Sequence, residues 1–81
     1  MAWVYILKGK RYYVGSTPTL IKRLKAHRQG NTHTTKRIGD WRLVWQKEFS
    51  TLEEARKAER KIKKWKSRKM IELLIQGKIN L

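Results

Sequence analysis

The excess of positive charge most restricts what this chain can fold into and bind. Twenty-one lysines and arginines stand against six acidic residues, a formal net charge of +15 over 81 residues. Such a field repels itself in the compact state and attracts polyanions. A membrane-binding helix would carry Leu or Phe along one face, but the most basic stretch, residues 61–66, offers only Ile62 and Trp65. The charge therefore favours nucleic acid over a membrane as the partner.

The apolar content is enough for one small core. The hydrophobic fraction is 40%, so we expect one folded domain over residues 1–81. The chain has no cysteine, which excludes disulfides, thiolate zinc sites and cysteine nucleophiles and suits a cytoplasmic location. No apolar run approaches the ~18 residues of a membrane span, and the N-terminal residues do not resemble a signal peptide.

The first half of the chain predicts a hairpin, a helix and a strand. Residues 3–7 and 11–15 are rich in β-branched and aromatic residues and read as a hairpin. We expect the helix from Pro18 to about Arg28, with Thr17 as N-cap and Gly30 as the stop. A polar loop over 31–40 precedes a strand over 41–49. Its alternation places Leu43 and Trp45 on one side, and Arg42 and Val44 on the other.

The second half predicts two helices. Ser50 and Glu53 form a capping box that opens a helix to about Lys66, and Ser67 starts a short helix that Gly77 closes. The expected order is β-β-α-β-α-α. The fold class is therefore α+β, with a three-stranded antiparallel sheet flanked by helices.

One carboxylate interrupts the apolar stripe of the long helix. The stripe runs Leu52, Ala55, Glu59, Ile62, so Glu59 occupies a position where an apolar residue is expected. Burying a lone carboxylate costs several kcal/mol, and the group therefore needs a cation or a metal. Two interpretations remain open: a salt bridge, to Lys63 or to an arginine elsewhere, or a functional metal ligand.

The first helix carries the opposite charge on its apolar side. Arg23 and His27 follow Leu20 at three and seven residues, so they share the buried edge that Leu20 and Leu24 mark. Arg23 and Glu59 either pair with each other or flank a phosphate, and a hydrogen-bonded boundary position is the simpler interpretation for His27 alone. His33 is expected on the surface. Two histidines and no cysteine exclude a zinc finger.

The acidic residues limit the metal chemistry. Only Glu59 of the six acids is expected to face inward, whereas a two-metal phosphodiester enzyme needs several carboxylates. The chain can hold one metal ion, with water and phosphate oxygens completing the shell, as Mg²⁺ prefers.

These motifs, taken in order, resemble the GIY-YIG nuclease superfamily. Val4-Tyr5-Ile6 and Tyr13-Val14-Gly15 resemble its two paired tripeptides, although Val4 replaces the first glycine. The stretch from Arg23 to His27 and the Glu-Ala-x-x-x-Glu motif that ends at Glu59 match its two helices. The similarity runs from Trp3 to about Leu74, and is greatest to the small stand-alone bacterial members.

The resemblance implies a site and a reaction. It implies one divalent ion, Mg²⁺ or Mn²⁺, ligated by Glu59, with Arg23 neutralising charge on the phosphoryl group and no small-molecule cofactor. Tyr5 and Tyr13 would position or deprotonate the attacking water. A phenol is a weak base at neutral pH whereas imidazole is not, and the proton acceptor is therefore either Tyr5 or His27.

A shared site for the two tyrosines requires one hairpin register. Residues that face each other across a hairpin share a side of the sheet. Residue 7 must then pair with Tyr13 and Tyr5 with residue 15, which leaves the three-residue loop Gly9-Lys10-Arg11. A two-residue turn would send the rings to opposite faces.

The leading functional expectation is a metal-dependent endonuclease that cuts DNA in preference to RNA. Its substrate surface is expected to include Lys36, Arg37, Arg60, Lys61, Lys64 and Arg68. The alternatives are a non-catalytic DNA- or RNA-binding module on the same scaffold and a ribosome-associated structural protein, for which an inward-facing Glu59 has no purpose. The sequence does not predict an oligomeric state.

Overall fold

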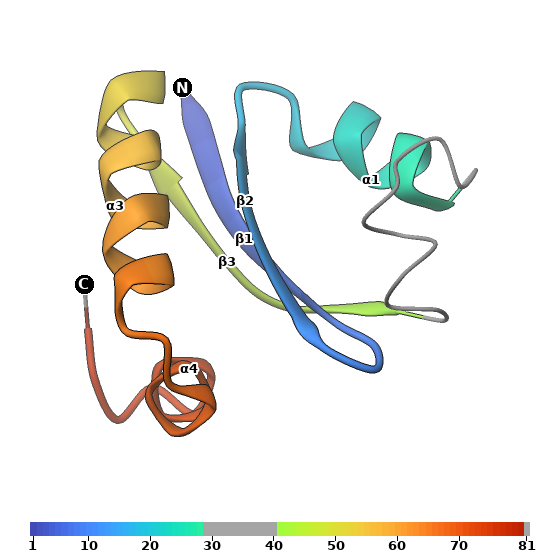
Figure 1. The fold of residues 1–81 in the computed structure, drawn as a ribbon. Coiled ribbons are helices and arrows are strands. Elements are labelled where there is room, and N and C mark those ends of the chain that lie inside the picture. The colour runs from blue at the N-terminus through green and yellow to red at the C-terminus, as the bar shows by residue number, and fades with distance from the viewer. Residues whose placement is uncertain (29–40, 81) are drawn as a thin grey trace.

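The computed structural model describes residues 1–28 and 41–80 as a three-stranded sheet with three helices (Figure 1). Strand β1 is central, and both of its neighbours run antiparallel to it, in the order β2-β1-β3. The predicted α+β class and the order β-β-α-β-α-α are confirmed. The elements are β1 (Ala2–Lys8), β2 (Tyr12–Thr17), α1 (Leu20–Arg28), β3 (Arg42–Phe49), α3 (Leu52–Lys64) and α4 (Arg68–Ile75).

Both faces of the central strand are covered, which explains its nearly continuous apolar sequence. Ala2, Val4 and Ile6 belong to a core that includes the inner residues of α3 and Leu74 of α4. Tyr5 and Leu7 belong to a second cluster with residues from α1 and the start of β3. Helix α3 accordingly lies on one side of the sheet and α1 on the other (Figure 1).

The hairpin has the predicted register. Lys8 pairs with Tyr12, which leaves residues 9–11 as a three-residue loop. Leu7 pairs with Tyr13, and Tyr5 pairs with Gly15. The side chains of Tyr5 and Tyr13 therefore lie on the same side of the sheet.

The predicted alternation along the third strand is wrong at its centre. Ile6 pairs with Trp45, but the next residue, Leu7, pairs with Leu43. Val44 is thus an extra residue in a β-bulge, which shifts the faces on either side of it. Leu43 packs with Leu7 on the α1 side, whereas Trp45 and Val44 pack against the core on the α3 side.

Two predicted helix starts move by one or two residues. Thr17 ends β2, and its Oγ1 accepts a hydrogen bond from Thr19 N (3.1 Å), which folds a turn around Pro18 before α1 begins at Leu20. The N-cap of α3 is Thr51 rather than Ser50, with Thr51 Oγ1 accepting from the backbone N–H of residue 54 (3.2 Å).

Helix α4 begins and ends as predicted. Ser67 caps it by accepting from Met70 N (3.3 Å). Gly77 follows with a φ of +76°, its N–H donates to Leu74 O, and Lys78 N–H donates to Leu73 O. These two bonds form a Schellman motif, which favours glycine at the left-handed position. No helix in residues 1–28 or 41–80 is long and apolar enough to span a membrane.

Candidate active site

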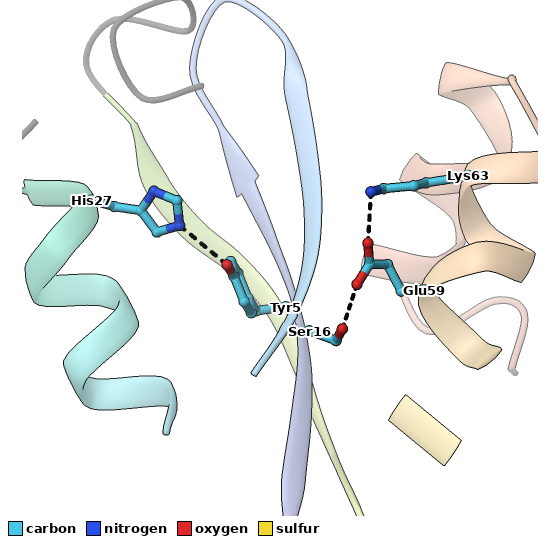
Figure 2. Close-up of polar contacts among 5 residues, drawn as sticks. All are labelled: Tyr5, Ser16, His27, Glu59 and Lys63. Atoms are coloured by element: carbon cyan, nitrogen blue, oxygen red, sulfur yellow. Dashed lines mark hydrogen bonds and ion pairs between the residues drawn. The ribbon is translucent and has the colours of Figure 1, made fainter. Parts of the chain in front are cut away.

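Three rings meet on the α1 side of the sheet. The ring centroids of Tyr5 and Tyr13 are 6.1 Å apart, and that of His27 lies 5.9 Å from Tyr5 and 5.4 Å from Tyr13. The Tyr5 hydroxyl is 3.1 Å from Nε2 of His27 (Figure 2). Tyr5 and His27 are both only 1% exposed. Leu20 and Leu24 pack into the same cluster and turn this side of α1, and with it His27, toward the sheet.

The burial of this pair fixes its protonation states. Burial raises the pKa of Tyr5 far above its ordinary value of 10.0, and Tyr13 adds to that effect. Burial, aided by the nearby Arg23 charge, lowers the pKa of His27 below 6.5. The phenol is therefore protonated and the imidazole neutral at pH 7. With the imidazole proton on Nδ1, the Tyr5 hydroxyl donates to Nε2, so His27 is the better proton acceptor of the two.

Arg23 is exposed, contrary to the expectation that it faces inward. Leu20, Leu24 and His27 occupy the inner side of α1. Position 23 lies at the edge of that side, about 40° around the helix from His27, and its long charged side chain extends into solvent. The guanidinium still acts on the rings, because its charge lowers the pKa of both Tyr5 and His27. Arg23 thus lies at the solvent-open rim of the ring cluster, where a phosphate can approach it.

Gly15 is a part of the site that the sequence analysis did not nominate. A Cβ atom at Gly15 would lie 2.5 Å from the Tyr5 hydroxyl oxygen and 2.6 Å from Cζ. Only glycine lets the phenol lie against β2 at this point. The available signal was the predicted pairing of Tyr5 with residue 15, which placed a glycine directly opposite the ring.

Glu59 lies on the other side of the hairpin (Figure 2). Ala55, Ala58 and Ile62 fill the core-facing seam of α3, and Glu59 sits at its border with a side chain 19% exposed. Ser16 Oγ donates a hydrogen bond to Oε1 of Glu59. Ser16 is a second contact that the sequence analysis missed, because its role depends on the packing of α3 against the edge strand.

Glu59 forms the salt bridge with Lys63 that was one of the two interpretations from the sequence. Lys63 Nζ donates to Oε2 of Glu59 at 2.6 Å, one turn along the same helix. Both oxygens of the carboxylate are therefore engaged, by Ser16 and by Lys63. The Glu59 charge also contributes to raising the pKa of Tyr5, so the two sides of the hairpin are electrostatically coupled.

The residues described around Glu59 do not form a complete metal site. In the described ranges, no group of three or more His, Cys, Asp or Glu side chains is placed to hold a metal. Mg²⁺ keeps several waters and commonly binds one or two carboxylates together with substrate phosphates. An open cavity of about 460 Å³ lies beside Glu59, and its lining also includes the carboxylate of Glu53, together with Ser16, Leu52, Arg56 and Arg60.

The expected nucleic-acid-binding cations fall into two groups. Arg60, Lys61, Lys64 and Arg68 are exposed on α3 and at the start of α4. Arg68 additionally lies 3.6 Å from Glu72. Lys36 and Arg37, together with His33, lie outside the described residues.

The two tripeptide strands, the ring cluster and the helical glutamate define the class of this protein. Residues 1–72 match the GIY-YIG catalytic domain, and the chain belongs to the GIY-YIG family. A similar solved structure is the solution NMR structure of the UPF0213 protein BH0048 from Bacillus halodurans. It is 35% identical, the match covers 96% of this chain and 86% of that one, and the TM-score is 0.61. No curated protein matches the chain.

Proposed function

We propose that this protein is a divalent-metal-dependent endonuclease that hydrolyses nucleic-acid phosphodiester bonds, with DNA preferred over RNA. The observation that carries the proposal is the buried hydrogen bond of 3.1 Å between Tyr5 and His27, in a chain of the GIY-YIG family. A buried phenol paired with a neutral imidazole is suited to proton transfer at neutral pH. The net charge of +15 supports a polyanionic substrate.

In the proposed reaction, Tyr5 relays a proton. A water molecule beside the ring loses a proton to the phenolic oxygen while the phenol passes its own proton to Nε2 of His27. The raised pKa of Tyr5 makes this acceptor necessary, because free phenolate is scarce at neutral pH. The hydroxide attacks phosphorus, the phosphorus–oxygen bond to the leaving strand breaks, and bulk water protonates the leaving oxygen.

Arg23 and Glu59 handle charge in this scheme. The Arg23 guanidinium, at the rim of the ring cluster, donates to two phosphoryl oxygens at once and neutralises charge that develops there. Glu59 would hold the metal, and a bound Mg²⁺ or Mn²⁺ supplies additional neutralisation of a non-bridging phosphate oxygen. Tyr13 packs against both Tyr5 and His27 and helps to hold the two rings in position.

One observation favours a second candidate, a non-catalytic nucleic-acid-binding module. The Lys63 ammonium occupies one Glu59 oxygen at 2.6 Å, the place where a metal ligand bond would form. If this ion pair persists with substrate bound, the site stays inactive while the basic surface still binds nucleic acid.

The test is cleavage of supercoiled plasmid, single strands and branched DNA, with matched RNA, in Mg²⁺, Mn²⁺ or chelator. Glu59→Gln is compared with Glu54→Gln, an exposed glutamate on the same helix. Arg23→Ala is compared with Lys25→Ala, an exposed cation on the same helix.

The proposal predicts metal-dependent cutting that falls about 100- to 1000-fold in Arg23→Ala and is lost in Glu59→Gln, with both control variants near wild type. Equal binding by all variants without any cutting would establish the binding module instead. Cutting that survives both active-site substitutions would identify a contaminating nuclease.

A further inference from the structure

A basic groove runs between the β1–β2 loop and the bend that joins α3 to α4. Its volume is about 400 Å³. Six uncharged residues and five cations line it: Tyr12, Tyr13, Val14, Ile62, Ser67 and Ile71, with Lys10, Arg11, Lys63, Lys66 and Arg68. Among the described residues that line the groove, none is acidic. A concave surface lined by one sign of charge concentrates counter-ions of the opposite sign. The groove therefore attracts an anion or a chain of anions.

Three of these cations have no carboxylate partner among the residues that the structure describes. Lys63 pairs with Glu59, and Arg68 lies near Glu72. Within residues 1–28 and 41–80, Lys10, Arg11 and Lys66 form no salt bridge with a carboxylate. A ligand that carries several negative charges would relieve the repulsion between them.

The backbone at Lys66 carries an independent signal. Lys66 has a φ of +46° and is the one non-glycine residue with positive φ in the described chain. It follows Trp65, the C-cap of α3, at the position where helices favour glycine because other residues are strained there. Strain at a special backbone position often marks a functional side chain. Lys66 is also one of the cations that line the groove.

Two residues link the groove to the candidate active site. Tyr13 lines the groove and also packs against Tyr5 and His27. Lys63 lines it and also contacts Glu59. Since Lys63 joins the two regions, a strand with one phosphate beside Glu59 passes close to the groove.

We infer that this groove binds the phosphate backbone of one nucleic-acid strand as it leaves the active site. The inference rests on the proposed function for the identity of the polyanion. We assign a single strand to the groove because the hairpin loop bounds it on one side and the α3–α4 bend on the other. Lys10, Arg11 and Lys66, which form no salt bridge within residues 1–28 and 41–80, supply the phosphate contacts.

The test measures the binding of a fluorescent oligothymidine by anisotropy, in chelator and over a series of salt concentrations. Each phosphate contact on a single strand adds about 0.7 to the slope of log affinity against log salt. Removing the three cations together (Lys10→Gln, Arg11→Gln, Lys66→Gln) should therefore lower the slope by about 2. The control removes three lysines elsewhere: Lys47, Lys57 and Lys78.

A single substitution separates charge from structure. Lys66→Gly relieves the backbone strain, so its melting temperature should equal or exceed that of the wild type, while its salt slope falls by about 0.7. A folding defect cannot produce weaker binding together with equal or greater stability. A wild-type slope in the triple variant, or an equal loss of slope in the control, overturns the inference.

The binding and cleavage experiments fail independently. The groove variants can show a smaller salt slope while no form of the protein cuts nucleic acid. That result would support the groove as a binding site and contradict the nuclease proposal. If the wild type cuts nucleic acid and the triple variant keeps the wild-type salt slope, the nuclease proposal is supported and the groove is not the binding site. A duplex of the same sequence that loses as much slope as the single strand contradicts the single-strand assignment.

Discussion

Replacing Gly15 with alanine puts a methyl group into space that the Tyr5 phenol occupies. The added carbon would lie 2.5 Å from the hydroxyl oxygen, 2.6 Å from Cζ and 3.1 Å from Cε1. Since carbon atoms pack at about 3.5–4.0 Å, the ring must move by about 1 Å. Tyr5 is only 1% exposed, so it has no free space to enter. The displacement therefore stretches or breaks its hydrogen bond to His27.

The magnitude follows from overpacking in a closed core. Such insertions cost about 1–3 kcal/mol, and each kcal/mol lowers the melting temperature of a domain of this size by about 4–8 °C. Gly15 does not lie in the left-handed region, so alanine is not strained by its own backbone. The loss comes from the ring contact alone. A 1 Å misplacement of a reacting group can also cost about 100-fold in rate.

Urea denaturation followed by tryptophan fluorescence measures the stability, and an NMR spectrum of the His27 imidazole reports the hydrogen bond. The matched experiment repeats Gly15→Ala in a Tyr5→Leu background, where the smaller side chain leaves room for the methyl group. The two substitutions should couple by about 0.5–3 kcal/mol. Wild-type stability for Gly15→Ala, together with an unchanged His27 spectrum, would refute the packing argument.

Three further perturbations address the charges of the site. Because the folded-state pKa of His27 lies below its ordinary 6.5, the unfolded chain binds more protons just below that pH. Stability should fall as the pH drops from about 6.5, and His27→Gln should remove this part of the urea-denaturation profile. Tyr5→Phe should lower the cleavage rate by about 100- to 10,000-fold. It should lower the free energy of unfolding by only about 1–3 kcal/mol, because the buried His27 imidazole loses its hydrogen-bond partner. Cleavage at the wild-type rate would exclude the phenol from the chemistry. Lys63→Gln removes a half-exposed competitor for Glu59. It should tighten Mn²⁺ binding roughly fivefold, for a screened pair worth about 1 kcal/mol, and calorimetry that shows weaker binding would indicate that Lys63 helps to hold the site.

The parts of the fold that depend on local chemistry could be predicted from the sequence. Glycine and serine signals predicted the ends of α4. The three-residue hairpin loop was predicted instead from the family resemblance, which requires Tyr5 and Tyr13 to share a side of the sheet. The Glu59–Lys63 ion pair follows from four-residue helical spacing, and it is present.

The features that depend on tertiary packing could not be predicted. Leu43, Val44 and Trp45 are consecutive apolar residues. No feature of their sequence indicates which of the three has no partner on β1 at the bulge. Ser50 and Thr51 are both able to cap α3, and the geometry of the preceding strand decides between them.

The candidate site also depends on tertiary packing that the sequence pattern does not reveal. His27 and Arg23 both lie near the buried edge of α1, but only the shorter, less polar side chain enters the core, and the guanidinium remains in solvent. Gly15 and Ser16 gain their roles only from residues far away in the chain, Tyr5 across the hairpin and Glu59 on α3.

The central claim is that one divalent ion binds at Glu59, beside the strand that carries Gly15. The most direct measurement is paramagnetic broadening of ¹⁵N-labelled protein by small amounts of Mn²⁺. The amide signals of Gly15 and Ser16 should broaden first, in the wild type and in Glu54→Gln, and should stay sharp in Glu59→Gln. Broadening that centres on the exposed acids of α3, or that persists in Glu59→Gln, would contradict the account.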